Sequence, residues 1–167
     1  MKTCVYPGSF DPVTGGHLDL ITRASAMFDK VTVVVMINRS KKGLFPVEKR
    51  CELLRKACLD LPNVEIGQWN GLLADYMKSH HENIVLRGIR NTADFENEYT
   101  AALANKLLYP DLETVILFAG DGKNAVSSSA VREIASFHGD FSGFVPVTVY
   151  EDIKQYIENE GGNQNGQ

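Results

Sequence analysis

The chain has 167 residues, of which 44% are hydrophobic, and a formal net charge of −4. This length suits one domain with a sizeable core, and the apolar content argues against intrinsic disorder. The net charge excludes nucleic-acid binding by bulk electrostatics, and no apolar run approaches the roughly 20 residues of a membrane span. Three cysteines, Cys4, Cys51 and Cys58, match no metal motif and favour a reducing cytoplasm.

Two kinds of pattern alternate along the chain. Short β-branched or apolar runs predict strands, and the nearly continuous run at 31–37 is typical of a strand covered on both faces. Apolar residues at intervals of three or four predict helices. In chain order we expect a strand at 3–6, a helix at 17–28, a strand at 31–37, a helix at 46–61, a strand at 64–66, a helix at 71–80, a strand at 83–86, a helix at 92–108, a strand at 113–118, a helix from 127 and a helix at 147–158.

This order predicts a single α/β domain over 1–160. We expect a doubly wound, Rossmann-like fold with a five-stranded parallel sheet and helices on both faces. Residues 161–167 carry no apolar side chain to bury, and we expect them to form a disordered tail. Ligands of such sheets bind beyond the carboxyl ends of the strands, where the strand order reverses, so the loops after the strands are the place to search.

The loop after the first strand reads Tyr6-Pro-Gly-Ser-Phe-Asp-Pro-Val-Thr-Gly-Gly-His17. Its glycines let the backbone approach a ligand, and the helix that follows offers an N-terminus to an anion. Ser9 and His17 add side-chain donors. The spacing matches neither a phosphate loop ending in Gly-Lys-Ser/Thr nor the dinucleotide fingerprint, and read alone the loop fits a plain connection with His17 as a helix cap.

Three further segments carry groups suited to phosphate. Asn38-Arg-Ser-Lys-Lys42 follows the second strand and holds Lys41, while Leu86-Arg-Gly-Ile-Arg90 places Arg87 and Arg90 on either side of a glycine. Arginine presents a planar fork to phosphate oxygens, although a short charge run is usually a solvated turn. Ser127-Ser-Ser129 opens a helix, where one serine serves as a cap and three in a row also suit an anion.

Together these loops predict two anion sites that face one cleft. Ser9, His17 and the serines lie on one side, with Lys41, Arg87 and Arg90 on the other. The spacing does not require a serine–histidine–acid triad, and no histidine or cysteine cluster suits zinc. The chemistry indicated is phosphoryl or nucleotidyl transfer through positioning and charge stabilisation, without a covalent intermediate.

The motifs also resemble a known family. The opening Gly-Ser-Phe-Asp-Pro-x-x-x-Gly-His and the later Ser-Ser-Ser-x-Val-Arg-Glu resemble the nucleotidylyltransferase superfamily. Arg87-Gly-Ile-Arg90 with Ala93-Asp-Phe-Glu96 and Glu98, and Ser40-Lys-Lys42 with Phe45, narrow the resemblance to the bacterial phosphopantetheine adenylyltransferase family. The similarity covers essentially residues 3–157.

The resemblance implies a reaction and a set of residues. ATP would adenylylate 4′-phosphopantetheine, with Mg²⁺, to give 3′-dephospho-coenzyme A and pyrophosphate in coenzyme A biosynthesis. It also implies a cytoplasmic homohexamer that is inhibited by coenzyme A. By matched position the catalytic residues would be His17, Lys41, Ser9 and Arg90; the ATP-binding residues Ser9, Phe10, His17, Gly88, Ile89, Arg90, Glu98, Lys123, Asn124, Ala125, Val126, Ser127, Ser128 and Ser129; and the residues that bind the acceptor Ser9, Lys41, Leu73 and Arg87.

We interpret His17 as a transition-state contact and not as a cap. Metal ligands stay unassigned, with Asp11 the only candidate. Two rival interpretations remain: a nucleotidylyltransferase for another phosphorylated acceptor, such as nicotinamide mononucleotide or glycerol phosphate, and a nucleotide sensor without turnover. The segment 87–96 favours pantetheine over the first, and the presence of Ser9, His17 and Lys41 argues against the second, because a sensor does not need groups that stabilise a transition state.

Overall fold

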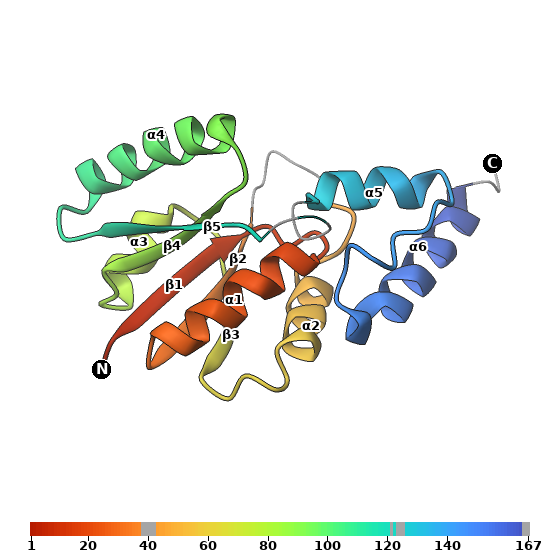
Figure 1. The fold of residues 1–167 in the computed structure, drawn as a ribbon, viewed down its shortest axis with the longest axis horizontal. Coiled ribbons are helices and arrows are strands. Elements are labelled where there is room, and N and C mark those ends of the chain that lie inside the picture. Colours follow the sequence, from red (N-terminus) through yellow and green to blue (C-terminus); the bar gives the residue numbers. More distant parts are fainter. Residues whose placement is uncertain (38–42, 121, 123–125, 165–167) are drawn as a thin grey trace.

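The computed structural model describes residues 1–37, 43–120, 122 and 126–164. Strands and helices alternate along it, with α5 and α6 at the end of the molecule away from the chain's N-terminus (Figure 1). The elements are β1 (Thr3–Gly8), α1 (Gly15–Met27), β2 (Lys30–Met36), α2 (Val47–Ala57), β3 (Val64–Trp69), α3 (Leu73–Ser79), β4 (Ile84–Ile89), α4 (Thr92–Leu108), β5 (Glu113–Phe118), α5 (Ser128–Ser136), the short 3₁₀ helix η2 (Val147–Val149) and α6 (Tyr150–Gln164).

The strands form one parallel sheet in the order β3-β2-β1-β4-β5. β1 pairs with β2 from Thr3 opposite Lys30 to Gly8 opposite Val35. On its other side β1 pairs with β4, with Val5 opposite Val85. The order therefore reverses between β1 and β4, which confirms the predicted doubly wound, five-stranded α/β fold and places its switch point at the ends of these two strands.

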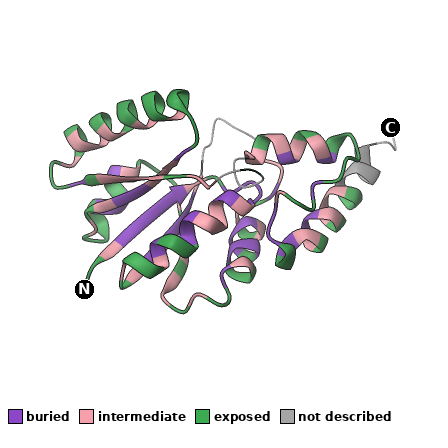
Figure 2. Ribbon diagram, viewed as in Figure 1, coloured by how far each residue is buried: buried purple, intermediate pink, exposed green. Residues whose placement is uncertain are grey.

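Helices cover both faces of the sheet, and the central strands are accordingly buried along their length (Figure 2). On one face Cys4, Tyr6 and the alternate valines of β2 pack with apolar residues of α1 and α2. On the other face Val5, Val34 and Val85 pack against Tyr76 and Met77 of α3. This alternation follows from the two-residue side-chain period of a strand.

Three strands run further than the sequence indicates. β1, β3 and β4 each end two or three residues beyond the apolar runs, through segments that contain glycine or proline. The neighbouring strands impose this, since Gly8 pairs with Val35, Gly67 with Val34 and Gly88 with Leu117. Local propensity is overridden by the ladder, and the functional loops begin correspondingly later.

The C-terminal helix is also longer than expected. α6 extends to Gln164, so that residues 161–164, which their composition assigns to a disordered tail, continue the helix. Residues 165–167 lie outside the described part. Within the described ranges, no helix combines the length and the apolar character that crossing a membrane requires.

Candidate active site

A cleft of about 840 Å³ opens at the switch point of the sheet. It lies beyond the ends of β1 and β4, and the N-terminal ends of α1 and α5 border it. Helix N-termini carry unpaired backbone N–H groups and favour anions. Among the predicted residues, those that line the cleft are Ser9, Phe10, His17, Arg87, Gly88, Arg90, Glu98, Val126, Ser127, Ser128 and Ser129.

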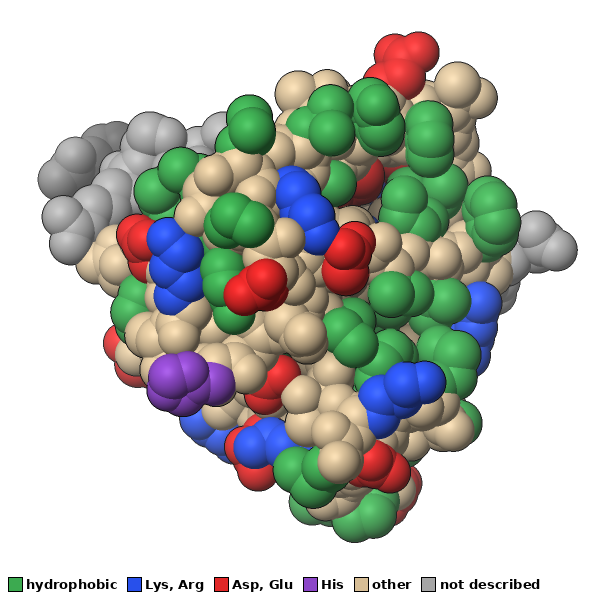
Figure 3. Space-filling model, turned by 90° about the vertical axis from the view of Figure 1, so that its left-hand side faces the viewer, with side chains coloured by type: hydrophobic (Ala, Val, Ile, Leu, Met, Phe, Trp, Pro, Cys, Tyr) green, Lys and Arg blue, Asp and Glu red, His purple; other side chains and the backbone are tan. Residues whose placement is uncertain are grey.

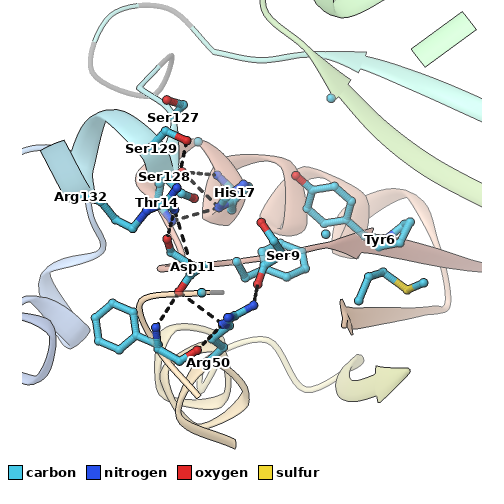
Figure 4. Close-up of a pocket in the computed structure, with 18 of the residues that line it drawn as sticks. Tyr6, Ser9, Asp11, Thr14, His17, Arg50, Ser127, Ser128, Ser129 and Arg132 are labelled. Atoms are coloured by element: carbon cyan, nitrogen blue, oxygen red, sulfur yellow. Dashed lines mark hydrogen bonds and ion pairs between the residues drawn. The ribbon is translucent and has the colours of Figure 1, made fainter. Parts of the chain in front are cut away.

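His17 lies in the first turn of α1 and takes part in its cap (Figure 4). The Thr14 hydroxyl accepts from the His17 backbone N–H at 3.3 Å, and the Thr14 backbone N–H donates to Nδ1 of His17 at 3.1 Å. These reciprocal bonds form a capping box. Our interpretation that His17 is not a cap is therefore wrong, because its ring supplies the second bond of the box.

The cap determines which ring nitrogen of His17 carries the proton. A backbone N–H can only donate, so Nδ1 must be unprotonated and the neutral ring holds its proton on Nε2. Burial, together with the charges of Arg90 and Arg87, lowers the pKa of His17 to about 4. His17 thus lines the cleft as a neutral imidazole with Nε2–H as donor, and capping and ligand binding use different atoms.

Phe10 supports this ring instead of lining the cleft with its own side chain. Its ring is fully buried and packs edge-on against His17, with 4.9 Å between the centroids. The backbone at Phe10 has a φ of 45°, in the left-handed region, and a Cβ on Gly8 would lie only 2.9 Å from the Phe10 ring. Phe10 as a whole is fully buried, so it forms the wall of the cleft behind the His17 ring.

Arg87 and Glu98 form a two-pronged ion pair in the wall of the cleft. Nε and Nη2 of Arg87 donate to the two carboxylate oxygens of Glu98, each at 2.6 Å. Nη1 donates to the Pro7 carbonyl at 2.7 Å. The two residues were assigned to different substrates, and here they are in contact, so Glu98 fixes the direction in which the Arg87 guanidinium points.

A second cavity of about 300 Å³ borders the same ion pair. It shares Ser9, Arg87 and Glu98 with the cleft. Its other walls are mostly apolar and include Leu73, which the sequence assigns to the acceptor and which lies outside the lining of the cleft. The two cavities therefore share Ser9 and Arg87. The cleft carries the serines and arginines among apolar residues, and the second cavity is mostly apolar.

Each serine at the start of α5 already makes a hydrogen bond. Ser127 is the N-cap, and its hydroxyl accepts from the backbone N–H of Ala130 at 3.2 Å. Ser128 donates to the Pro12 carbonyl at 2.8 Å, and Ser129 accepts from Nη2 of Arg132 at 3.1 Å. Ser127 is thus the cap that the sequence predicts. Ser128 connects α5 to the loop after β1, and Ser129 bonds to Arg132 within α5.

The remaining predicted residues differ in position. Arg90 lines the cleft and pairs with Asp94 at 2.9 Å, and this hydrogen bond lowers the pKa of Asp94 despite an opposing effect of burial. Ile89 is buried, and its carbonyl accepts from the backbone of Ala119, so its side chain is not brought into the cleft. Lys41, Lys123, Asn124 and Ala125 lie outside the described residues.

Three residues of the site were not predicted, Thr14, Arg50 and Arg132, and a fourth, Asp11, was predicted only as a candidate metal ligand. All four line the cleft, and Asp11 and Thr14 are buried. Thr14 lies three residues before His17, which is the spacing of a capping box and could have been recognised from the sequence. Arg50 lies in the charged stretch Glu48-Lys-Arg50 of a helix, which is typical of an exposed face, so the sequence gives no signal for its burial.

The described residues do not provide a metal site. In the ranges that the structure covers, no group of three or more histidine, cysteine, aspartate or glutamate side chains could hold a metal ion. The carboxylate of Asp11, the one candidate ligand, accepts from two backbone N–H groups and pairs with Arg50 at 3.3 Å. These observations do not support a magnesium ion that is held by the protein alone.

The fold and the site together define a class. The parallel sheet has a switch point, and the cleft beyond its strand ends suits an anion. A neutral histidine lines this cleft together with two arginines, each of which is paired with a carboxylate. Such an arrangement is suited to binding and transferring a nucleotide. In agreement, the sequence model of the cytidylyltransferase-like family matches residues 5–134 of this chain.

Curated relatives narrow this class. A phosphopantetheine adenylyltransferase of Clostridium perfringens is 43% identical over 162 residues, which cover 97% of this chain and 99% of the relative. The enzyme of Clostridium tetani is 44% identical, over 96% of this chain and 100% of the relative. That of Clostridium botulinum is 46% identical, over 92% of this chain and 96% of the relative. The chain belongs to the phosphopantetheine adenylyltransferase family of cytidylyltransferase-like proteins, and the resemblance inferred from the motifs is confirmed.

Proposed function

We propose that this protein transfers the adenylyl group of ATP to 4′-phosphopantetheine, giving 3′-dephospho-coenzyme A and pyrophosphate. The single observation that carries the proposal is the meeting of the two cavities at Ser9 and Arg87. The cleft suits a triphosphate because serines, arginines and two helix N-termini border it. The mostly apolar cavity suits the pantetheine arm, and it brings the acceptor's phosphate to the place where the two compartments join.

The reaction is a direct displacement at the α-phosphorus of ATP. An oxygen of the phosphopantetheine phosphate forms a bond to this phosphorus, while the bond to the oxygen that bridges to the β-phosphorus breaks and its electrons leave with pyrophosphate. Negative charge grows on the equatorial oxygens, and groups that donate to them lower the barrier. No described side chain is required to form a covalent intermediate.

In this account His17 donates from Nε2 to an oxygen of the α-phosphate in the transition state. The capping box and the Phe10 ring hold the imidazole in one orientation. A donor that is oriented before the reaction costs no reorganisation when charge develops. Ser9 would contact both substrates, and Arg87, directed by Glu98, would bind the acceptor's phosphate.

The other predicted contacts complete the proposal. Arg90, the backbone at Gly88 and Ile89, and Ser128 and Ser129 would hold the nucleotide and its outer phosphates, and Val126 and Ser127 belong to the same wall. Lys41 would orient the attacking phosphate, and Lys123, Asn124 and Ala125 would cover ATP. Because the described residues offer no carboxylate cluster, we propose that Mg²⁺ is held by the phosphates of ATP, and no step here depends on a protein ligand to the metal.

The assembly and regulation are also proposals. α4 has no buried residue, and it exposes a row of large apolar side chains that comprises Phe95, Tyr99, Leu103, Leu107 and Leu108. Figure 3 shows hydrophobic side chains gathered on the side of the molecule where α4 lies. Such a face suits contact with further copies, which supports a homohexamer. Coenzyme A retains the framework of the product and would inhibit the enzyme by occupying both cavities. We also propose that the reaction takes place in the cytoplasm.

Release of pyrophosphate from ATP, measured with a panel of acceptors, tests the proposed activity. We expect turnover with 4′-phosphopantetheine and none with nicotinamide mononucleotide or glycerol phosphate. Product with either of the other acceptors, and none with phosphopantetheine, would favour the rival transferase. Binding of ATP without any turnover would favour the sensor.

A further inference from the structure

The buried carboxylate of Asp11 lies where three walls of the cleft meet, and the proposed reaction assigns it no role. Its Oδ1 accepts from the backbone N–H of Phe45 and its Oδ2 from that of Leu44, both at 2.9 Å. Asp11 thereby ties the loop after β1 to the segment that leads into α2.

Arg50 of α2 joins the same contact from the opposite side (Figure 4). Its Nε lies 3.3 Å from Oδ1 of Asp11 and donates to the Phe45 carbonyl at 2.7 Å. Its Nη1 reaches the backbone carbonyl of Ser9 at 3.4 Å. A buried guanidinium is costly unless its charge is paired and its donors are used. Here Asp11 pairs with the charge, and Nε and Nη1 donate to the carbonyls of Phe45 and Ser9.

Gly43 leaves the space that this guanidinium occupies. A Cβ at position 43 would lie 1.6 Å from Nη2 and 2.7 Å from Cζ of Arg50. These separations are far below van der Waals contact, so any side chain at this position would displace Arg50. The arrangement therefore depends on the absence of a side chain at a residue that itself touches no substrate in the proposed reaction.

Arg132 of α5 provides the third link. Its Nη1 donates to the backbone carbonyl of Asp11 and lies 3.7 Å from Oδ2 of the same residue. Its Nη2 donates to the Ser129 hydroxyl at 3.1 Å. The serine end of α5 is thus fixed to the same aspartate that fixes the loop carrying Ser9.

We propose that Asp11, with Arg50 and Arg132, forms a set of positioning residues for the transfer reaction. The set holds Ser9 and Ser129 at the separation that the transition state requires. It acts through these two serines and does not touch the reacting atoms. This inference rests on the proposed function. Misplacing a group by about 1 Å can lower a rate by roughly a hundredfold, so the effect is expected on kcat.

The test compares Gly43→Ala with Gly67→Ala. The first keeps every charged and hydrogen-bonding side chain but displaces Arg50, whereas a Cβ on Gly67 would meet nothing within 4 Å. Both are assayed well below their melting temperatures, so that unfolded enzyme is not counted. We expect Gly43→Ala to lose about tenfold or more in kcat, with a smaller change in KM for ATP, and Gly67→Ala to match the wild type. Asp11→Asn and Arg132→Gln should resemble Gly43→Ala.

A Gly43→Ala enzyme that melts earlier but retains the kcat of Gly67→Ala would overturn the inference, because the set would then serve stability alone. If Gly43→Ala does not fold, Arg132→Gln decides by the same criterion, since this side chain is 35% exposed and its loss spares the core. Absence of turnover in both the wild type and Gly67→Ala would overturn the proposed function, and this inference with it.

Discussion

His17 has two separable roles, and replacing it by alanine and by glutamine tells them apart. His17→Ala removes both the acceptor for the Thr14 backbone N–H and the Nε2 donor. Loss of a cap bond costs about 1 kcal/mol, equivalent to about 2 to 4 °C in melting temperature for a chain of this size. Loss of one donor to developing charge costs about 3 kcal/mol of barrier, which is roughly a hundredfold in kcat.

His17→Gln is the matched control for this pair. Glutamine at this position of a capping box supplies the acceptor that the Thr14 N–H needs. Its amide NH2 can donate, but from a flexible chain that lacks the fixed direction of the ring Nε2–H. We therefore expect His17→Gln to regain most of the melting temperature and little of the rate. The assays are thermal unfolding, kcat at saturating substrates and the dissociation constant of ATP, which should change little in either variant.

Two results would refute this reasoning about His17. If His17→Ala loses stability but keeps the kcat of the wild type, the histidine acts as a cap only. If the affinity for ATP falls as much as kcat in His17→Ala, the ring binds ATP in the ground state and gives no preferential stabilisation of the transition state.

Three further predictions follow from particular contacts. Arg87→Lys, which cannot form the two-pronged pair, should raise KM for phosphopantetheine more than KM for ATP in steady-state kinetics; equal increases would contradict the assignment. Leu103→Asp on the α4 face should reduce the mass of the assembly in light scattering, whereas Leu59→Asp, at an exposed position in the turn after α2, should not; an unchanged mass in Leu103→Asp would argue against α4 as the contact. Because burial lowers the pKa of His17 to about 4, the native state binds fewer protons than the unfolded chain between about pH 4 and the ordinary histidine pKa of about 6.5. Denaturant unfolding should therefore show the wild type losing stability relative to His17→Gln as the pH falls through this window, and parallel curves would contradict it.

Much of the fold follows from strongly periodic segments. The helix expected at 92–108 and the strand expected at 113–118 have the bounds that the structure gives them. The strand ends were less predictable, because glycine and proline carry no strand signal of their own. They are extended only because a neighbouring strand pairs with them, and that information is not local.

The sequence predicted which loops border the site, but not the ion pairs and hydrogen bonds that connect them. The switch-point rule led to the strand ends at which the cleft lies, and most of the predicted residues in the described part line that cleft. The sequence could not show that Arg87 and Glu98, which it assigns to different ligands, form one ion pair. It also could not show that Arg50 is buried against Asp11, since a helical arginine beside Glu48 and Lys49 normally faces solvent.

The most direct test of the account is the stereochemistry of the transfer itself. ATP made chiral at its α-phosphorus by one sulfur is incubated with the enzyme and 4′-phosphopantetheine, and the configuration of the dephospho-coenzyme A formed is determined. A direct displacement predicts product with inverted configuration. Product with retained configuration would require a covalent adenylyl-enzyme and contradict the mechanism, and the absence of this product would contradict the proposed activity.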